Sequence, residues 1–250
     1  MHHRILAIEA AASRAWPPIE REALHGWLLR YGRAGSRRLN SVQTLEFGPG
    51  TDLDESLAVV ERWYQARQLP SCFQLNDAVR PTDLDAVLND RGYERITPTS
   101  VMIANELPAI ECHDLRIEIL PHADARVLRA ITDPSWPAEK KDERVDLFAR
   151  LESPHVFALV MEGGDPIAGG MCAVDGQLAG LFSMRTQAAH RGRGLARAVA
   201  LRLMRWAREQ GVRQLYLQVE DDNAPALHLY RQLGFERVYG YHYREKGVGD

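Results

Sequence analysis

Two glycines and three arginines at the start of a predicted helix form the segment of this sequence best suited to bind an anion. The segment, RGRGLAR, runs from Arg191 to Arg197 between a predicted strand and that helix. Gly192 and Gly194 carry no side chain, so a ligand can approach their N–H groups closely. The first turn of a helix leaves N–H groups without intrahelical partners, and the arginines, including Arg193, add positive charge. This combination predicts a site for a phosphate or pyrophosphate.

Other phosphate- or nucleic-acid-binding motifs do not fit this segment. A P-loop is excluded because no Gly-Lys-Ser/Thr follows. The dinucleotide fingerprint G-x-G-x-x-G requires glycine at position 197, where the chain has arginine. An RNA-binding Arg-Gly segment is flanked by disorder, whereas a periodic helix follows here. The remaining alternative is a glycine-rich turn with solvated arginines.

The hydrophobic pattern predicts that this segment belongs to an α/β arrangement. Apolar residues recur at helical spacing from Leu195 to Trp206, and Gly211 ends the helix. Three strands separated by Gly/Asp turns precede it within 155–186. The elements expected after it are a strand at 213–220, a short helix that stops at Gly234, and a last strand at 236–245. We therefore expect a mixed sheet flanked by helices.

The N-terminal half repeats this order at an offset of 142 residues, the shift from Gly92 to Gly234. The same shift relates 84–96 to 226–238, 26–45 to 168–187, and 54–68 to 196–210. A duplication explains this better than convergence of element order, which remains the alternative. We predict two tandem domains, 1–108 and 109–250, joined by the polar stretch 104–115.

Two linked motifs in the C-terminal half resemble a known family. RGRGLA at 191–196 is similar to the R/Q-x-x-G-x-G/A signature of the GCN5-related N-acetyltransferases (GNATs), and NAPALHLYRQLGF at 223–235 is similar to the segment that follows it. The N-terminal half resembles a degenerate copy, as in tandem members of the family. The resemblance implies two GNAT-like domains, each a mixed, mostly antiparallel sheet flanked by helices, and acetyl-CoA as cofactor. The cofactor-binding residues that it implies are Met184, Arg185, Thr186, Arg191, Gly192, Arg193, Gly194, Leu195, Ala196, Arg197 and Asn223.

The resemblance also suggests roles in acetyl transfer to an amine. Tyr230 lies seven residues after Asn223, at the family's general-acid position, and a phenol is protonated at neutral pH. Packing beside Leu227 and Leu233 is the alternative for this tyrosine. A backbone N–H near Met184 or Arg185 would hold the thioester carbonyl.

The general base stays unassigned. Several family members carry glutamate five residues before the asparagine, where this chain has Gln218. Glu220 is the nearest carboxylate, His190 is expected at the surface, and an ordered water is a further alternative. Tyr239, Tyr241 and Tyr243 share one strand face and either pack against a neighbouring element or line an acceptor pocket.

The N-terminal copy lacks this chemistry. Asp52, Asp54 and Glu55 stand at its phosphate-loop position, where they would repel a pyrophosphate, and Leu88 stands at its acid position. We expect this half to bind no acetyl-CoA and to cover the acceptor cleft or support the other half.

Composition favours an ordinary cytoplasmic protein. The 250 residues carry a formal net charge of −3, which disfavours a nucleic-acid-binding function, and no apolar run is long enough to cross a membrane. Cys72, Cys112 and Cys172 form no metal or disulfide pattern. We expect no metal, and a monomer or homodimer. The sequence favours a small-molecule N-acetyltransferase; the alternatives are a protein N-terminal or lysine acetyltransferase and an idle acyl-CoA-binding regulator.

Overall fold

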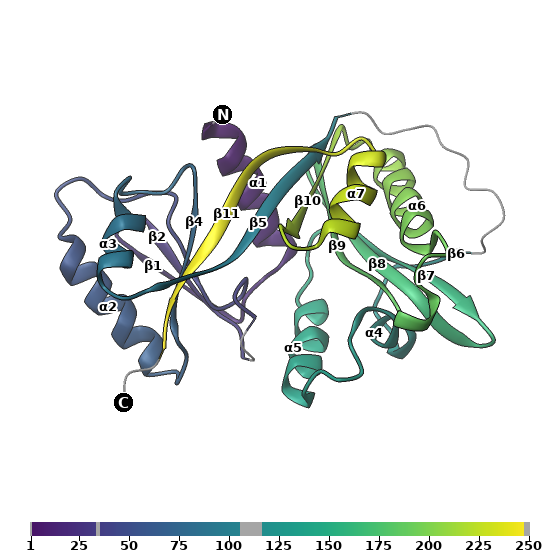
Figure 1. Cartoon of the computed structure of the whole chain (residues 1–250), viewed down its shortest axis with the longest axis horizontal. Helices are drawn as coiled ribbons and strands as arrows, with labels where there is room; N and C mark the ends of the chain where they lie inside the picture. The colour runs from purple at the N-terminus through teal and green to yellow at the C-terminus, as the bar shows by residue number, and fades with distance from the viewer. Residues whose placement is uncertain (1, 34–35, 106–116, 248–250) are drawn as a thin grey trace.

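The computed structural model describes residues 2–33, 36–105 and 117–247, whose strands form one eleven-stranded mixed sheet (Figure 1). The helices are α1 (His2–Ala15), α2 (Leu53–Gln65), α3 (Leu84–Asp90), α4 (Ala125–Ile131), α5 (Ala138–Ala149), α6 (Leu195–Glu209) and α7 (Ala224–Gln232). The strands are β1 (Glu20–Leu24), β2 (Trp27–Tyr31), β3 (Val42–Gln43), β4 (Ser71–Asn76), β5 (Glu94–Ala104), β6 (Ile117–Leu120), β7 (His155–Glu162), β8 (Asp165–Asp175), β9 (Leu178–Thr186), β10 (Gln214–Glu220) and β11 (Glu236–Lys246). Within the described ranges, no helix is long and apolar enough to cross a membrane.

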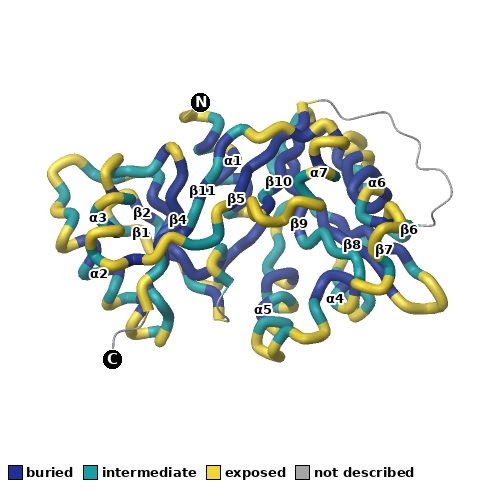
Figure 2. Tube along the Cα trace, in the orientation of Figure 1, coloured by how far each residue is buried: buried dark blue, intermediate teal, exposed yellow. Residues whose placement is uncertain are grey.

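Helices cover both faces of the sheet, and buried residues follow it through the middle of the molecule (Figure 2). One face packs on α1, α4 and α5, through a cluster that includes Ile8, Phe157 and Tyr239. The other face packs on α6 and α7 in the C-terminal half and on α2 and α3 in the N-terminal half. Burial of these apolar surfaces is the main force that holds the layers together.

The last strand of each half is inserted beside strands of the other half. The order β1-β2-β3-β4-β11-β5-β10-β9-β8-β7-β6 places β11 next to β4, and β5 next to β10. In β11, Lys246 pairs with Ser71, and in β5, Thr99 pairs with Glu220, both in antiparallel register. The ranges 1–108 and 109–250 therefore exchange strands in space, and their division at residue 108 stays a prediction.

The 142-residue offset relates the start of several observed elements. Helix α2 begins at Leu53 and α6 at Leu195, while β5 begins at Glu94 and β11 at Glu236. The three strands expected within 155–186, the strand after the phosphate loop and the last strand are all present as β7 to β11. Helices α1, α4 and α5 had not been predicted. Most of the predicted boundary, together with Cys112, lies outside the described residues; Cys72 and Cys172 are buried free thiols.

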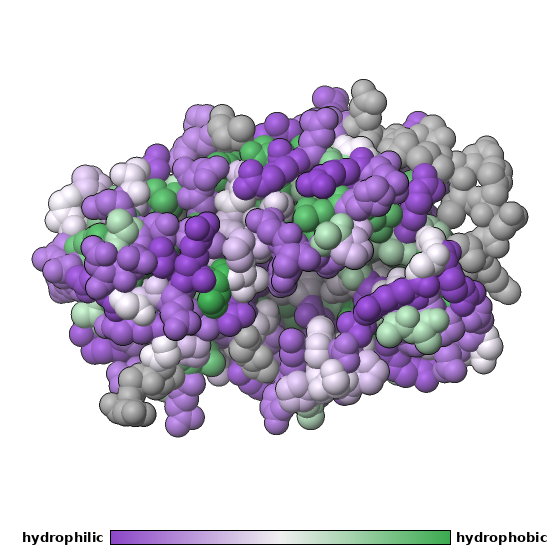
Figure 3. Space-filling view, in the orientation of Figure 1, coloured by the Kyte–Doolittle hydropathy of each residue, from purple (hydrophilic) through white to green (hydrophobic). Residues whose placement is uncertain are grey.

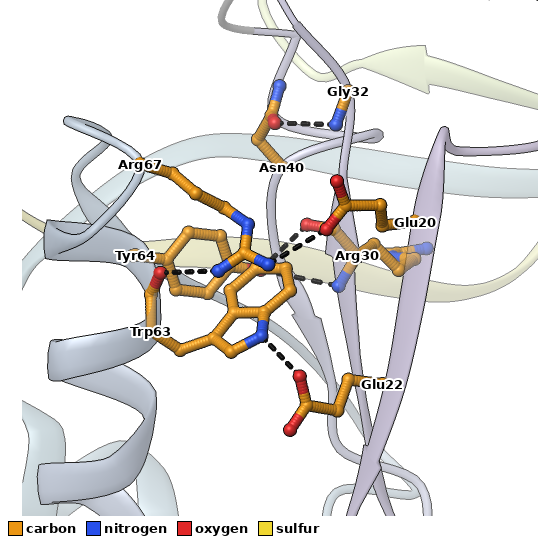
Figure 4. A network of polar contacts seen from close by, with 8 residues as sticks. All are labelled: Glu20, Glu22, Arg30, Gly32, Asn40, Trp63, Tyr64 and Arg67. Atoms are coloured by element: carbon orange, nitrogen blue, oxygen red, sulfur yellow. Dashed lines mark hydrogen bonds and ion pairs between the residues drawn. The ribbon is translucent and has the colours of Figure 1, made fainter.

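A polar network fixes α2 against β1 and β2 in the N-terminal half (Figure 4). The Arg67 guanidinium stacks 3.7 Å from the centre of the Trp63 ring and donates to Glu20 Oε2 at 2.8 Å. The indole N–H of Trp63 donates to Glu22, and the Tyr64 hydroxyl donates to the Arg30 carbonyl at 2.9 Å. These polar groups satisfy one another's hydrogen bonds, so this network has a structural role.

Candidate active site

The two strands at the centre of the C-terminal half separate to form a V-shaped opening. Strands β9 and β10 pair in parallel only from Leu178 and Gln214 to Leu181 and Leu217. Beyond that point β9 stays paired with β8, and β10 with β5. Ser183 has a φ of 53° at a register shift, so a bulge turns β9 where it leaves β10.

A cavity of about 710 Å³ lies beside this opening, on the face covered by α6 and α7. It is lined by Tyr230 and by every residue predicted to bind the cofactor except Arg193. None of the side chains that line it is a carboxylate. The cavity thus joins the predicted phosphate site, the end of β9 and the predicted acid in one continuous space.

The phosphate-binding segment has the geometry expected from its glycines. Gly192 and Gly194 have φ values of 76° and 75°, a left-handed conformation in which other residues are strained. Gly194 is the N-cap of α6, and the first intrahelical bond runs from the Ala198 N–H to the Gly194 carbonyl at 3.1 Å. The N–H groups before Ala198 are free for an anion, and the first turn contains no acidic residue. Arg191 and Arg197 line the same end of the cavity.

Arg193 does not line the cavity. Its guanidinium forms an ion pair with Glu162 at 2.6 Å and contacts His190 Nδ1 at 2.9 Å. Hydrogen bonding from Arg193 lowers the pKa of the Glu162 carboxyl. The cofactor role predicted for Arg193 therefore has no support from its side-chain position. His190, by contrast, lines the cavity and is not only a surface residue.

Three buried polar atoms at the end of β9 have no hydrogen-bond partner within the described part of the chain. They are Ser183 Oγ, Arg185 Nε and Thr186 Oγ1. The Arg185 guanidinium also forms a short ion pair with Asp133. Hydrogen bonds from Ser135, and a further one from Arg185, lower the pKa of the Asp133 carboxyl. Buried polar groups are normally satisfied, so the end of β9 is unusual in this respect. Arg185 and Thr186 also line the cavity, whereas Ser183 does not. The sequence analysis had not singled out Ser183, because its left-handed backbone is not visible in the residue pattern.

Tyr230 and Asn223 enter the cavity from α7. Tyr230 is 7% exposed, its ring packs edge-on against Phe235 at 5.9 Å, and burial raises the pKa of its hydroxyl to about 12. The hydroxyl has no hydrogen bond with another described residue, so it is available to a ligand. Asn223 caps α7, and its Oδ1 accepts from the Ala226 N–H at 3.2 Å.

Gln218 and the carboxylate Glu220 lie apart from this cavity. Gln218 accepts a hydrogen bond from the Tyr241 hydroxyl at 3.1 Å, and Glu220 is exposed at the end of β10 and does not line the cavity. Tyr239, Tyr241 and Tyr243 are buried in the cluster that packs on α1, where the Tyr239 hydroxyl donates to Glu9 at 2.7 Å. The packing interpretation of this tyrosine stripe is therefore confirmed.

The equivalent positions of the N-terminal half serve structural roles. The Asp52 carboxylate caps α2 by accepting from the Glu55 N–H at 3.0 Å. Asp54 forms an ion pair with Arg91, and Leu88 is fully buried in the local core.

Comparison with known proteins places this geometry in a family. A family model described as "Probable histone acetyltransferase Rv0428c C-terminal" matches residues 3–244. The uncharacterized N-acetyltransferase YobR of Bacillus subtilis is 28% identical over 267 residues, covering 97% of this chain and 98% of its own length. A GCN5-related N-acetyltransferase from Kribbella flavida superimposes with a TM-score of 0.68 at 15% identity, over 99% of this chain and 96% of that one.

A tandem GNAT protein from the clavulanic acid biosynthesis pathway superimposes with a TM-score of 0.64 at 14% identity, over 97% of this chain and 88% of that one. At such identities the solved structures show a shared fold alone. The match to the family model shows that this chain belongs to the Rv0428c acetyltransferase family, within the GNAT superfamily. It is an acetyltransferase.

Proposed function

We propose that this chain transfers the acetyl group of acetyl-CoA to the amine of a small molecule, by direct attack in a ternary complex. The observation that carries the proposal is the single cavity beside the opening of β9 and β10. It combines helix N–H groups suited to a pyrophosphate, the end of β9 beyond its pairing with β10, which suits an extended amide chain, and a buried phenol. The cofactor supplies an activated acetyl thioester.

The residues that line the cavity match the successive parts of acetyl-CoA from one end of the cavity to the other. The N–H groups of Gly192 to Arg197 would hold the pyrophosphate, with Arg191 and Arg197 as counter-charges. The end of β9, from Met184 to Thr186, would hold the pantetheine arm and present a backbone N–H to the acetyl carbonyl.

Tyr230 would hold the proton needed by the departing thiolate. Because burial raises its pKa, the hydroxyl stays protonated throughout the neutral range and can act only as a donor of that proton. We propose that an ordered water on the side of Gln218 and Tyr241 accepts the proton of the amine, since the cavity itself offers no carboxylate.

The position of the helices indicates the face from which the acceptor approaches. Helices α6 and α7 cover the cofactor side, so an amine must approach from the opposite face of the sheet. That face is bordered by α1 from the N-terminal half and by α4 and α5 from the C-terminal half. Space-filling atoms show a hollow near the centre of the molecule, between its two ends (Figure 3).

A screen of acceptors tests the proposal. The enzyme is mixed with acetyl-CoA and either single small amines or short peptides, and release of free thiol is measured. Turnover of small amines alone supports the proposal. Turnover of peptides alone would favour protein acetylation, the activity named for the family's type protein. Binding of acetyl-CoA without turnover of any amine would favour a regulator that only binds acyl-CoA.

A further inference from the structure

A ladder of alternating cationic and aromatic side chains borders the acceptor side of the V-shaped opening. Phe182 lies on β9 next to the bulge, and its ring stacks on Trp16 at 5.4 Å. The Arg38 guanidinium lies 5.5 Å from the centre of the Trp16 ring and 5.9 Å from that of Phe182. The Arg144 guanidinium lies 4.5 Å from the centre of the same Trp16 ring.

The ladder continues outward along α5 and is built by both halves of the chain. Arg144 also lies 5.8 Å from the ring of Trp136, and Lys140 Nζ lies 4.3 Å from the same ring. Trp16 and Arg38 come from the N-terminal half, whereas Arg144 and Trp136 come from the C-terminal half. The three cations and their aromatic partners therefore form a chain of contacts that ends at Phe182, next to the point where β9 and β10 separate.

The two inner arginines have no ion pair with any carboxylate of the described residues. This sets them apart from their neighbours, because Arg33 pairs with Asp146 at 3.2 Å and Arg37 pairs with Glu245 at 2.9 Å. Burial lowers the pKa of Arg144 to about 10; nearby Glu143 opposes the shift and the positive charge of Arg38 adds to it. The pKa of Arg38 is raised: burial opposes this shift, but the nearby Tyr241 and Tyr243 outweigh it. The two guanidiniums therefore lie close enough for their charges to interact, and a carboxylate between them would relieve that repulsion.

We infer that the acetyl acceptor carries a carboxylate beside its amine, and that Arg38 and Arg144 bind this carboxylate. A carboxylate is the preferred partner because its two oxygens match the fork of a guanidinium in length and plane. Trp16 and Phe182 are almost fully buried, and their ring contacts hold the two guanidiniums in position. The inference rests on the proposed function and narrows its acceptor to amino acids and related amino carboxylates. It also gives the N-terminal half a direct role in recognising the acceptor.

The test compares amino acids with their neutral amides. Each of the common amino acids and its amide is assayed with acetyl-CoA by thiol release, with wild-type enzyme and the variants Arg38→Gln and Arg144→Gln. The amino group of the amide is less basic than that of the acid, so a larger fraction of it is neutral and reactive. This difference favours the amide and therefore works against the expected preference for the acid. We expect at least one amino acid to have a kcat/KM more than tenfold above that of its amide. Either variant should raise the KM of the acid by about 10- to 100-fold while the amide is unaffected.

Two further variants are matched controls. Arg33→Gln removes a nearby exposed arginine that is already ion-paired, and it should leave the KM of the acid unchanged. Arg144→Lys keeps the charge and should restore part of the affinity. Melting temperatures measured beforehand confirm that each variant is folded. Equal use of acids and amides, or a preference for phosphoethanolamine over every amino acid, would overturn the inference and leave the proposed function intact.

A binding measurement covers the case in which no amine is turned over. The melting temperature of the complex with coenzyme A is then followed while each acid and amide is added. Stabilisation by an acid that is lost in Arg144→Gln supports the inference, and its absence overturns it. A failure of acetyl-CoA itself to stabilise the chain would overturn the proposed function instead.

Discussion

Replacing Tyr230 by phenylalanine separates its proposed role in catalysis from its role in packing. The change deletes one hydroxyl that has no hydrogen bond with another described residue, and it keeps a ring that packs against Phe235. The loss of a general acid lowers turnover by about 10²- to 10⁴-fold. We therefore expect kcat to fall by that factor, while the Kd for acetyl-CoA and the stability at pH 7 stay close to wild type.

The raised pKa of Tyr230 gives the same variant a second signature. Because the pKa is about 12 in the folded chain and near 10 in an unfolded one, the protonated hydroxyl contributes stability that is fully present below pH 10. That contribution is lost as the pH rises toward 12. Relative to wild type, the variant should gain about 1 kcal/mol in free energy of unfolding between pH 9 and pH 11. The other buried tyrosines are present in both proteins, so their contributions cancel in the difference in free energy of unfolding.

The assays are thiol release for kcat, calorimetry for the Kd, and urea unfolding at several pH values for stability. Wild-type turnover in Tyr230→Phe would refute the acid role and leave this tyrosine as a packing residue. A normal kcat combined with a weaker Kd would show that the hydroxyl binds the cofactor and donates no proton. An unchanged stability difference at pH 11 would show that the hydroxyl is hydrated in the folded protein.

Three other experiments test the cofactor site and the role of each half. Gly194→Asp places a carboxylate among the helix N–H groups and should abolish the rise in melting temperature caused by acetyl-CoA. The matched control is Gly211→Asp, which lies at the other end of α6 with a similar φ of 78° and open space around it. This control should keep the rise. Retention of the shift in a folded Gly194→Asp variant would contradict the phosphate site. Calorimetry should give one acetyl-CoA per chain, because the N-terminal loop carries Asp52 as a helix cap, and two equivalent sites would show that this half also binds cofactor. Deleting residues 1–108 removes β5 from beside β10, so the fragment should aggregate or bind acetyl-CoA weakly; a soluble fragment with full affinity would show that β5 is dispensable.

The sequence allowed the local elements around the cofactor site to be predicted, because helix periodicity, strand alternation and glycine positions are local signals. The glycine-rich segment before α6 and the end of α7 near Gly234 follow directly from such signals, whereas the capping of α7 by Asn223 was not predicted. The sequence did not allow the direction of Arg193 to be predicted, since its partner Glu162 lies 31 residues earlier on another strand. The ladder around Trp16 was missed for the same reason. Its members come from the end of α1, the segment before β3, the start and body of α5, and β9; Trp16 directly follows α1 and Trp136 precedes α5. Only the folded chain brings them together.

The exchange of β5 and β11 has a consequence for synthesis of the protein. Ser71 in β4 pairs with Lys246 in β11, so the N-terminal half of the sheet cannot be completed until β11 has been synthesised. Pairings between residues so far apart in the sequence also slow folding, because a long loop must close before they contribute stability. Until β11 arrives, the edge of β4 is open to strands of other nascent chains. The same exchange makes maturation all-or-none: a chain that stops before β11 lacks the partner of β4, and β5 then has a free edge beside the strand that flanks the active site.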